Sequence, residues 1–128
     1  MRFKHRQHFH LQAKAHAAGM AAGNAAQPTA MVVSEHANPL DDASAVRKQW
    51  FVADGVCGFA WVTIRPGTSS FARWMAKHGY VRKAYGGGVS HWVSEFGQSM
   101  ERKQAYAAAY AKVLTDAGVN AYAESRMD

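Results

Sequence analysis

Residues 58–80 read GFAWVTIRPGTSSFARWMAKHGY, and this stretch decides the fold that the sequence predicts. Its first seven residues alternate between two faces that both look buried, which is typical of a central strand. Pro66 breaks the strand, and a serine or threonine at 68–70 is suited to cap the helix predicted over 71–80. Gly79 is the expected stop of that helix.

The sequence on both sides extends this pattern. Downstream, Val89 to Phe96 alternates as a strand, a helix runs from a Ser99 cap to Gly118, and 119–125 is a closing strand. Upstream, Trp50–Val52 is expected to pair with 58–64 through a type I′ turn at Asp54–Gly55. The order predicts an α+β fold, a two-layer sandwich in which two helices cover one face of a mixed, mainly antiparallel sheet.

The N-terminal part is expected to be a helical arm. Residues 2–25 are rich in alanine and free of proline, so a helix is predicted. Its apolar stripe is thin, and two glycines weaken the last turns, so the helix needs a surface to lie on. The stripe consists of Phe9, Ala13, Ala17 and Met20, with Leu11 and Ala15 beside it, and the glycines are Gly19 and Gly23. The chain thus divides into an arm with a short strand (1–34), a linker loop (35–46) and a compact domain (47–128).

Composition limits the class of protein. With 128 residues, 48% hydrophobic, the chain fits one globular domain. Cys57 is the single cysteine, which excludes an internal disulfide and favours a reducing compartment. The N-terminus lacks the apolar run of a signal peptide, and no stretch approaches the roughly 20 apolar residues of a membrane span.

Positive charge gathers in the arm. The net charge is +6, and four cations precede the first acidic residue, Glu35. A cationic arm of this kind suits an acidic protein surface, nucleic acid or lipid headgroups, although a solvated face explains it as well. The residues predicted to bind a partner are Arg2, Lys4, Arg6, Phe9 and Lys14.

A second basic cluster contains aromatic residues. Single-stranded nucleic acid is bound by cations that contact phosphates and by rings that stack on bases. No helix-turn-helix, zinc-finger or RNA-recognition signature accompanies the cluster, which weighs against this interpretation. The predicted nucleic-acid residues are Arg65, Arg73, Lys77, Arg82, Lys83 and Tyr85.

No residue set indicates catalysis, a metal or a cofactor. The arm histidines lack carboxylate or cysteine partners at zinc-site spacing, and Gly86 to Gly88 lead into a strand rather than a helix. Cys57 has no local signature of a nucleophile, so core packing is the better interpretation. A small cysteine- or metal-dependent enzyme is the third hypothesis. The arm histidines are His5, His8, His10 and His16.

Three blocks carry a resemblance. They are DGVCGFAWVTIRPG (54–67), GGVSHWVSEFGQSMERKQAYA (87–107) and AYAESRMD (121–128), and the lead AAGMAAGNAAQPTAMVV (17–33) is similar too. They resemble a family of small phage and prophage proteins without an established activity. This resemblance implies a bacterial host cytoplasm or a virion, and it brings no catalytic residues.

The leading functional prediction is therefore a non-catalytic interaction protein of phage type. It would dock on a larger viral or host protein through its basic arm, as a virion assembly or decoration component or as an inhibitor. The alternative is a nucleic-acid-binding accessory protein that uses the basic and aromatic cluster.

Overall fold

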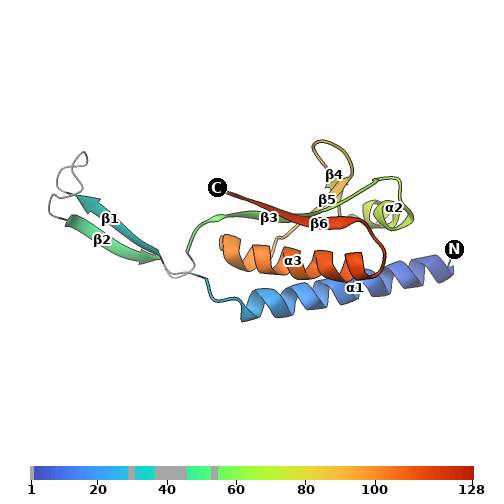
Figure 1. Cartoon of the computed structure of the whole chain (residues 1–128), viewed down its shortest axis with the longest axis horizontal. Helices are drawn as coiled ribbons and strands as arrows, with labels where there is room; N and C mark the ends of the chain where they lie inside the picture. Colours follow the sequence, from blue (N-terminus) through green and yellow to red (C-terminus); the bar gives the residue numbers. More distant parts are fainter. Residues whose placement is uncertain (1, 29–30, 37–45, 53–54) are drawn as a thin grey trace.

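The computed structural model describes residues 2–28, 31–36, 46–52 and 55–128 (Figure 1). Three helices and six strands follow one another in these parts of the chain. They are α1 (Arg2–Ala25), β1 (Met31–His36), β2 (Val46–Val52), β3 (Gly58–Ile64), α2 (Ser70–Lys77), β4 (Arg82–Lys83), β5 (Val89–Trp92), α3 (Met100–Asp116) and β6 (Ala121–Met127).

Strands β3 to β6 form one antiparallel sheet in the order β4-β5-β3-β6. β3 is the central strand, as predicted, and pairs with β5 on one side and with β6 along its whole length on the other. The chain contains two βαβ units, β3-α2-β4 and β5-α3-β6. In the sheet, β5 lies between β3 and β4, and β3 lies between β5 and β6. This is the split βαβ arrangement of ferredoxin-like folds. The α+β prediction is confirmed, with a sheet that is wholly antiparallel.

Local signals fix both helices that follow sheet strands. The Ser69 hydroxyl accepts a hydrogen bond from the backbone N–H of Ala72, and the Ser99 hydroxyl accepts one from Arg102. Beyond the helix ends, Gly79 and Gly118 adopt φ angles of 79° and 89°. Glycine reaches this left-handed region without steric cost, so the predicted stops are confirmed.

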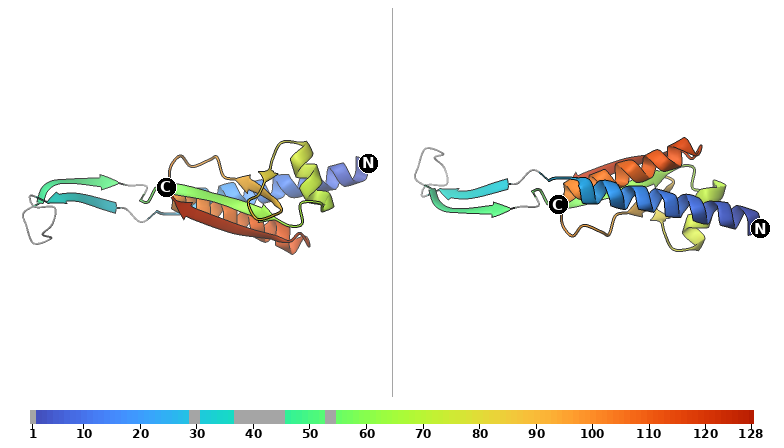
Figure 2. Two further views of the ribbon diagram at one scale, coloured as in Figure 1. Left: turned by 90° about the horizontal axis from the view of Figure 1, so that it is seen from above. Right: turned by 90° about the horizontal axis from the view of Figure 1, so that it is seen from below.

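Helix α1 has the predicted extent and lies alongside α3 on the helical side of the sheet (Figures 1 and 2). The predicted apolar stripe is wrong for Phe9, Ala13 and Ala17, which are exposed, and right for Met20, which packs against the core. The buried side instead carries Ala15 and Gly19, with Gly23 one turn further along. Small residues let the two helix backbones approach closely, so the surface that α1 needs is α3 of its own chain.

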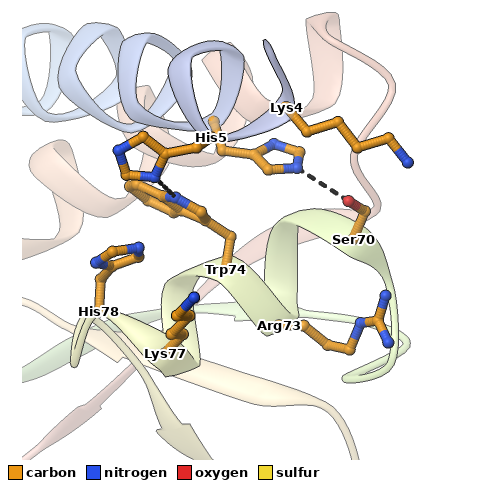
Figure 3. Close-up of a pocket in the computed structure, with 8 residues that line it drawn as sticks. Lys4, His5, Ser70, Arg73, Trp74, Lys77 and His78 are labelled. Carbon is orange, nitrogen blue, oxygen red and sulfur yellow. Dashed lines mark hydrogen bonds between the residues drawn. The ribbon is translucent and has the colours of Figure 1, made fainter. Parts of the chain in front are cut away.

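Aromatic rings occupy the space that the glycines leave. A Cβ atom added at Gly19 would lie 2.7 Å from the Tyr106 ring, and one at Gly23 would lie 2.3 Å from the Phe96 ring. A hydrogen bond of 2.6 Å joins the Tyr106 hydroxyl to His16 Nδ1. Near the start of α1, the Trp74 indole of α2 donates a hydrogen bond of 2.9 Å to His5 Nδ1 (Figure 3). Helix α1 is thus anchored at several points along its length.

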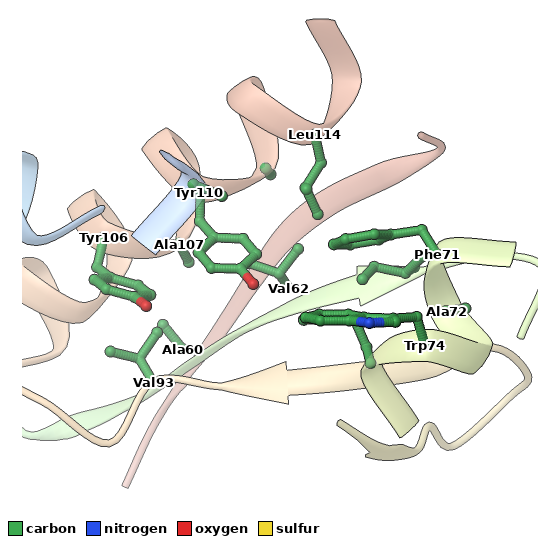
Figure 4. Close-up of a cluster of buried hydrophobic side chains, with 14 residues drawn as sticks. Ala60, Val62, Phe71, Ala72, Trp74, Val93, Tyr106, Ala107, Tyr110 and Leu114 are labelled. Carbon is green, nitrogen blue, oxygen red and sulfur yellow. The ribbon is translucent and has the colours of Figure 1, made fainter. Parts of the chain in front are cut away.

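The core lies between the sheet and its helices (Figure 4). Tyr106, Tyr110 and Leu114 of α3 are fully buried, and they face the alternate residues Ala60 and Val62 of β3. Helix α2 adds Phe71 and Trp74 to the same cluster. Val113 of α3 is partly buried beside this cluster.

Strands β1 and β2 form a separate antiparallel hairpin that projects from the rest of the chain (Figure 1). The predicted pairing of Trp50–Val52 with 58–64 is wrong, because Trp50 pairs with Val33 and Val52 with Met31. β3 already has β5 and β6 as neighbours, so no edge is left for β2. Asp54 and most of the predicted linker loop, 37–45, lie outside the described residues.

Candidate nucleic-acid interface

The face of the sheet that points away from the core carries aromatic side chains. On the two central strands these are Phe59, Trp61 and Trp92, each half-buried. Trp61 and Trp92 stand opposite each other in the register, and their rings stack with centroids 4.5 Å apart. In the described part of the chain no helix covers this face, which we call the open face. The prediction that both faces of 58–64 are buried holds for the side of Ala60 and Val62. On the other side Thr63 is buried as well, whereas Phe59 and Trp61 are only half-buried.

Guanidinium groups surround these rings. The Arg82 guanidinium lies 4.5 Å from the Trp92 ring centroid, and that of Arg126 lies 5.6 Å from the centroid of Phe59. The strand pairing explains the first contact, because Arg82 is opposite Ser90 and therefore on the same face as Trp92. An arginine stacked on a ring keeps its charge and its outer N–H donors available to a ligand.

A groove of about 540 Å³ opens between the rings and the β4–β5 turn. The turn is closed by a hydrogen bond from Ala84 N–H to the Gly88 carbonyl, and Gly86 to Gly88 all have positive φ. It carries Tyr85, whose side chain is fully exposed. The glycine run thus makes a tight hairpin and has no helix N-terminus behind it.

Glu124 is the acidic residue among the described residues that line the groove. Its Oε2 accepts hydrogen bonds from Trp61 Nε1 (3.0 Å) and from Thr63 Oγ1 (2.6 Å). Both bonds run between neighbouring strands, because Glu124 pairs with Trp61 in the register. The carboxylate therefore fixes the orientation of the Trp61 indole.

The predicted nucleic-acid residues fall into two groups in the structure. Arg82, Lys83 and Tyr85 line the open-face groove. Arg65 lies at the rim of the open face, with its guanidinium 5.7 Å from the Tyr122 ring centroid. Arg73 and Lys77 are on α2 and line a different cavity. Sequence reasoning missed Phe59, Trp61, Trp92, Glu124 and Arg126 as functional residues.

The predicted arm residues Lys4, Arg6, Phe9 and Lys14 are exposed on α1, with Phe9 48% exposed. Arg2 is the first residue of the same helix. Cys57 is a free, exposed thiol rather than a core residue, so its predicted burial is wrong. Within the described residues, no group of three or more His, Cys, Asp or Glu side chains is placed to hold a metal ion.

No family model, curated protein or solved structure matches this chain. The resemblance to small phage proteins therefore stays a prediction. None of the described helices is long and apolar enough to cross a membrane. The ferredoxin-like topology assigns no activity either, because one fold serves many functions and only the chemistry of a site distinguishes them.

Proposed function

We propose that this protein binds single-stranded nucleic acid on the open face of its sheet. The observation that carries the proposal is the set of half-exposed rings on the two central strands, Phe59, Trp61 and Trp92, bordered by arginines. Bases stack on aromatic rings whatever their sequence, and cations along the strand neutralise phosphates. A four-stranded sheet that stacks two or three bases on its central aromatic residues is an established way to bind RNA.

The arrangement suits a single strand better than a duplex. Stacking needs unpaired bases that can lie flat on a ring, and the rings of the open face stand on its two central strands, which cannot enter a groove of double-stranded DNA. The backbone of the strand would follow Arg82, Lys83 and Arg126, with Tyr85 as a further exposed ring at the groove's end.

The interaction protein that docks through its arm stays the alternative. Because one side of α1 is covered by α3 of its own chain, only the opposite side of the helix is available to a partner. A viral or host partner would instead contact the exposed cations and Phe9. No contact in the described residues favours this alternative over the open face.

The test is a fluorescence-anisotropy titration of the full chain against labelled single-stranded RNA and DNA, with a duplex for comparison. Trp92→Ala is expected to weaken single-strand binding by about 5- to 150-fold, because stacking is worth about 1–3 kcal/mol per base. Phe9→Ala, an exposed ring on α1, is the matched control and should bind like the wild type. Equal affinities of Trp92→Ala and wild type, or preference for the duplex, would reject the proposal.

A further inference from the structure

A second cavity lies between the start of α1 and α2, away from the open face (Figure 3). Its volume is about 420 Å³, which is within the usual range for small-molecule sites. Every ionisable side chain that lines it is basic. These are Lys4, His5 and His8 of α1, and Arg73, Lys77 and His78 at α2.

No carboxylate balances this charge. None of the lining residues is acidic, and no ion pair within the described residues engages Lys4, Arg73 or Lys77. Lys4, Arg73 and Lys77 are exposed, so water screens their mutual repulsion, but an anion in the cavity would meet three positive charges and no carboxylate. The arrangement is thus poised for an anionic ligand rather than for the stability of the fold.

Hydrogen bonds hold the walls of the cavity. The Trp74 indole donates to His5 Nδ1, so neutral His5 carries its proton on Nε2 as a donor. His8 Nε2 and the Ser70 hydroxyl share a hydrogen bond of 2.9 Å across the two helices. Trp74 itself stacks on Phe71 and Tyr80 in the core, which gives the site a rigid floor. Ser70 begins α2, where the helix dipole also favours an anion.

We propose that the α1–α2 cavity binds the phosphate of a phosphomonoester. Arginine and lysine give short, charge-assisted hydrogen bonds to phosphate oxygens, and the His5 Nε2–H adds a neutral donor. A free phosphorylated compound and the 5′-terminal phosphate of an oligonucleotide present this same group. The site goes beyond the proposed function, because it shares no lining residue with the open-face groove.

His8 adds a dependence on pH. Burial lowers the pKa of His8, and the nearby Lys4 and His5 lower it further. The charged and titratable groups around it are Lys4, Arg73, Lys77, His5 and His78, all of them basic. An anion whose own charge stays constant stabilises the His8 imidazolium, so its binding takes up a proton and becomes tighter as the pH falls.

The test is an NMR titration of the full chain with inorganic phosphate, followed at the Trp74 indole N–H. Wild type should bind in the millimolar range, and Arg73→Gln/Lys77→Gln should bind at least about tenfold more weakly, since each charge-assisted bond is worth about that factor. The matched control is Arg6→Gln/Lys14→Gln, which removes the same charge from exposed α1 positions and should bind like the wild type. Sulfate, whose charge is constant near neutral pH, should bind several-fold more tightly at pH 5.5 than at pH 7.5.

Equal phosphate affinities of the α2 double variant and the control would overturn the proposal, as would an indole resonance that phosphate does not move. Circular dichroism of each variant shows that it is folded. The source of the phosphate is identified in the Trp92→Ala background, with 5′-phosphorylated and 5′-hydroxyl oligonucleotides. A higher affinity for the 5′-phosphorylated oligonucleotide supports the 5′ end of a nucleic acid as the ligand. Phosphate binding without this increase in affinity supports a free phosphorylated compound as the ligand. Because Trp92 does not line this cavity, the proposed function and this site fail independently.

Discussion

Replacing Gly19 by alanine tests the packing of α1 on α3. Alanine inside a helix is usually more stabilising than glycine by about 1 kcal/mol. At Gly19, however, the new Cβ would lie 2.7 Å from Cδ2 and 2.8 Å from Cε2 of Tyr106. The Tyr106 ring is fully buried and its hydroxyl is bonded to His16, so it has no free space to move into. Such overpacking costs about 1–3 kcal/mol.

The midpoint of the overpacking cost is about 2 kcal/mol, and the helix gain of about 1 kcal/mol offsets part of it. We therefore expect Gly19→Ala to be less stable than the wild type by about 1 kcal/mol. For a domain of this size the melting temperature should fall by about 4 °C. Gly23→Ala is expected to be close to neutral, because its neighbour Phe96 is only partly buried and its ring can swing toward solvent. Urea and thermal unfolding, followed by circular dichroism, measure both values.

Asn24→Ala is the control, since Asn24 is exposed on the same helix and its replacement brings only the helix-propensity gain. A Gly19→Ala protein that melts above the wild type would refute the reasoning. It would mean that α1 does not approach Tyr106 as closely as described, and the anchoring of Lys4 and His5 against α2 would then lose its support.

Three other predictions follow from named contacts. Arg82→Gln/Arg126→Gln should make the plot of log binding constant against log salt concentration less steep by about 1.4, which is about 0.7 for each lost phosphate contact. An unchanged slope would contradict the role of these arginines. Tyr106→Phe loses the 2.6 Å bond to His16 and should cost about 1 kcal/mol in urea unfolding; wild-type stability would show that the bond contributes nothing. Burial lowers the pKa of His91, and this effect outweighs the Tyr80 carbonyl and Glu95, which raise it. The folded state therefore binds fewer protons than the unfolded state. The free energy of unfolding should thus be highest above pH 6.5 and fall as the pH drops through 6.5, while His91→Gln should flatten this fall.

Helix ends could be predicted because their signals are local. Ser69, Ser99, Gly79 and Gly118 act on backbone groups within one turn of the helix, so their effect does not depend on the rest of the fold. The pairing of strands is not local. The Asp54–Gly55 dipeptide suggested a turn, but β3 obtains its hydrogen bonds from strands that come much later in the chain.

The packing side of α1 was missed for a different reason. Apolar periodicity detects large side chains, whereas α1 packs through Ala15, Gly19 and Gly23, where the contact is made by rings from other elements. A glycine in a helix counts against stability when only propensity is considered. A spacing of four residues between small side chains was the available signal, and it indicates close approach to a neighbour.

The candidate site was half visible in the sequence. The cations were predicted as one cluster, but strand and helix direct them to different surfaces, with Arg82 on the sheet and Arg73 on α2. The rings were assigned to the core because alternation alone does not tell which face of a strand will be covered. Two helices cover only the side of Val62, and this leaves Trp61 and Trp92 on the open side.

Glu124 lies in a groove lined by cations, and its role follows from the two hydrogen-bond donors whose bonds it accepts. If Glu124 were absent, the Trp61 N–H and the Thr63 hydroxyl would lose their shared acceptor, and the bond that orients the indole would be gone. If a nucleic-acid strand binds as proposed, the cost of one negative charge beside its phosphates is reduced, because Arg82, Lys83 and Arg126 line the same groove. The bond to Glu124 holds the stacked pair of Trp61 and Trp92 in place before a ligand binds, so less conformational entropy is lost on binding. Glu124 is thus a positioning residue, and it makes the open face a fixed surface rather than a set of mobile rings.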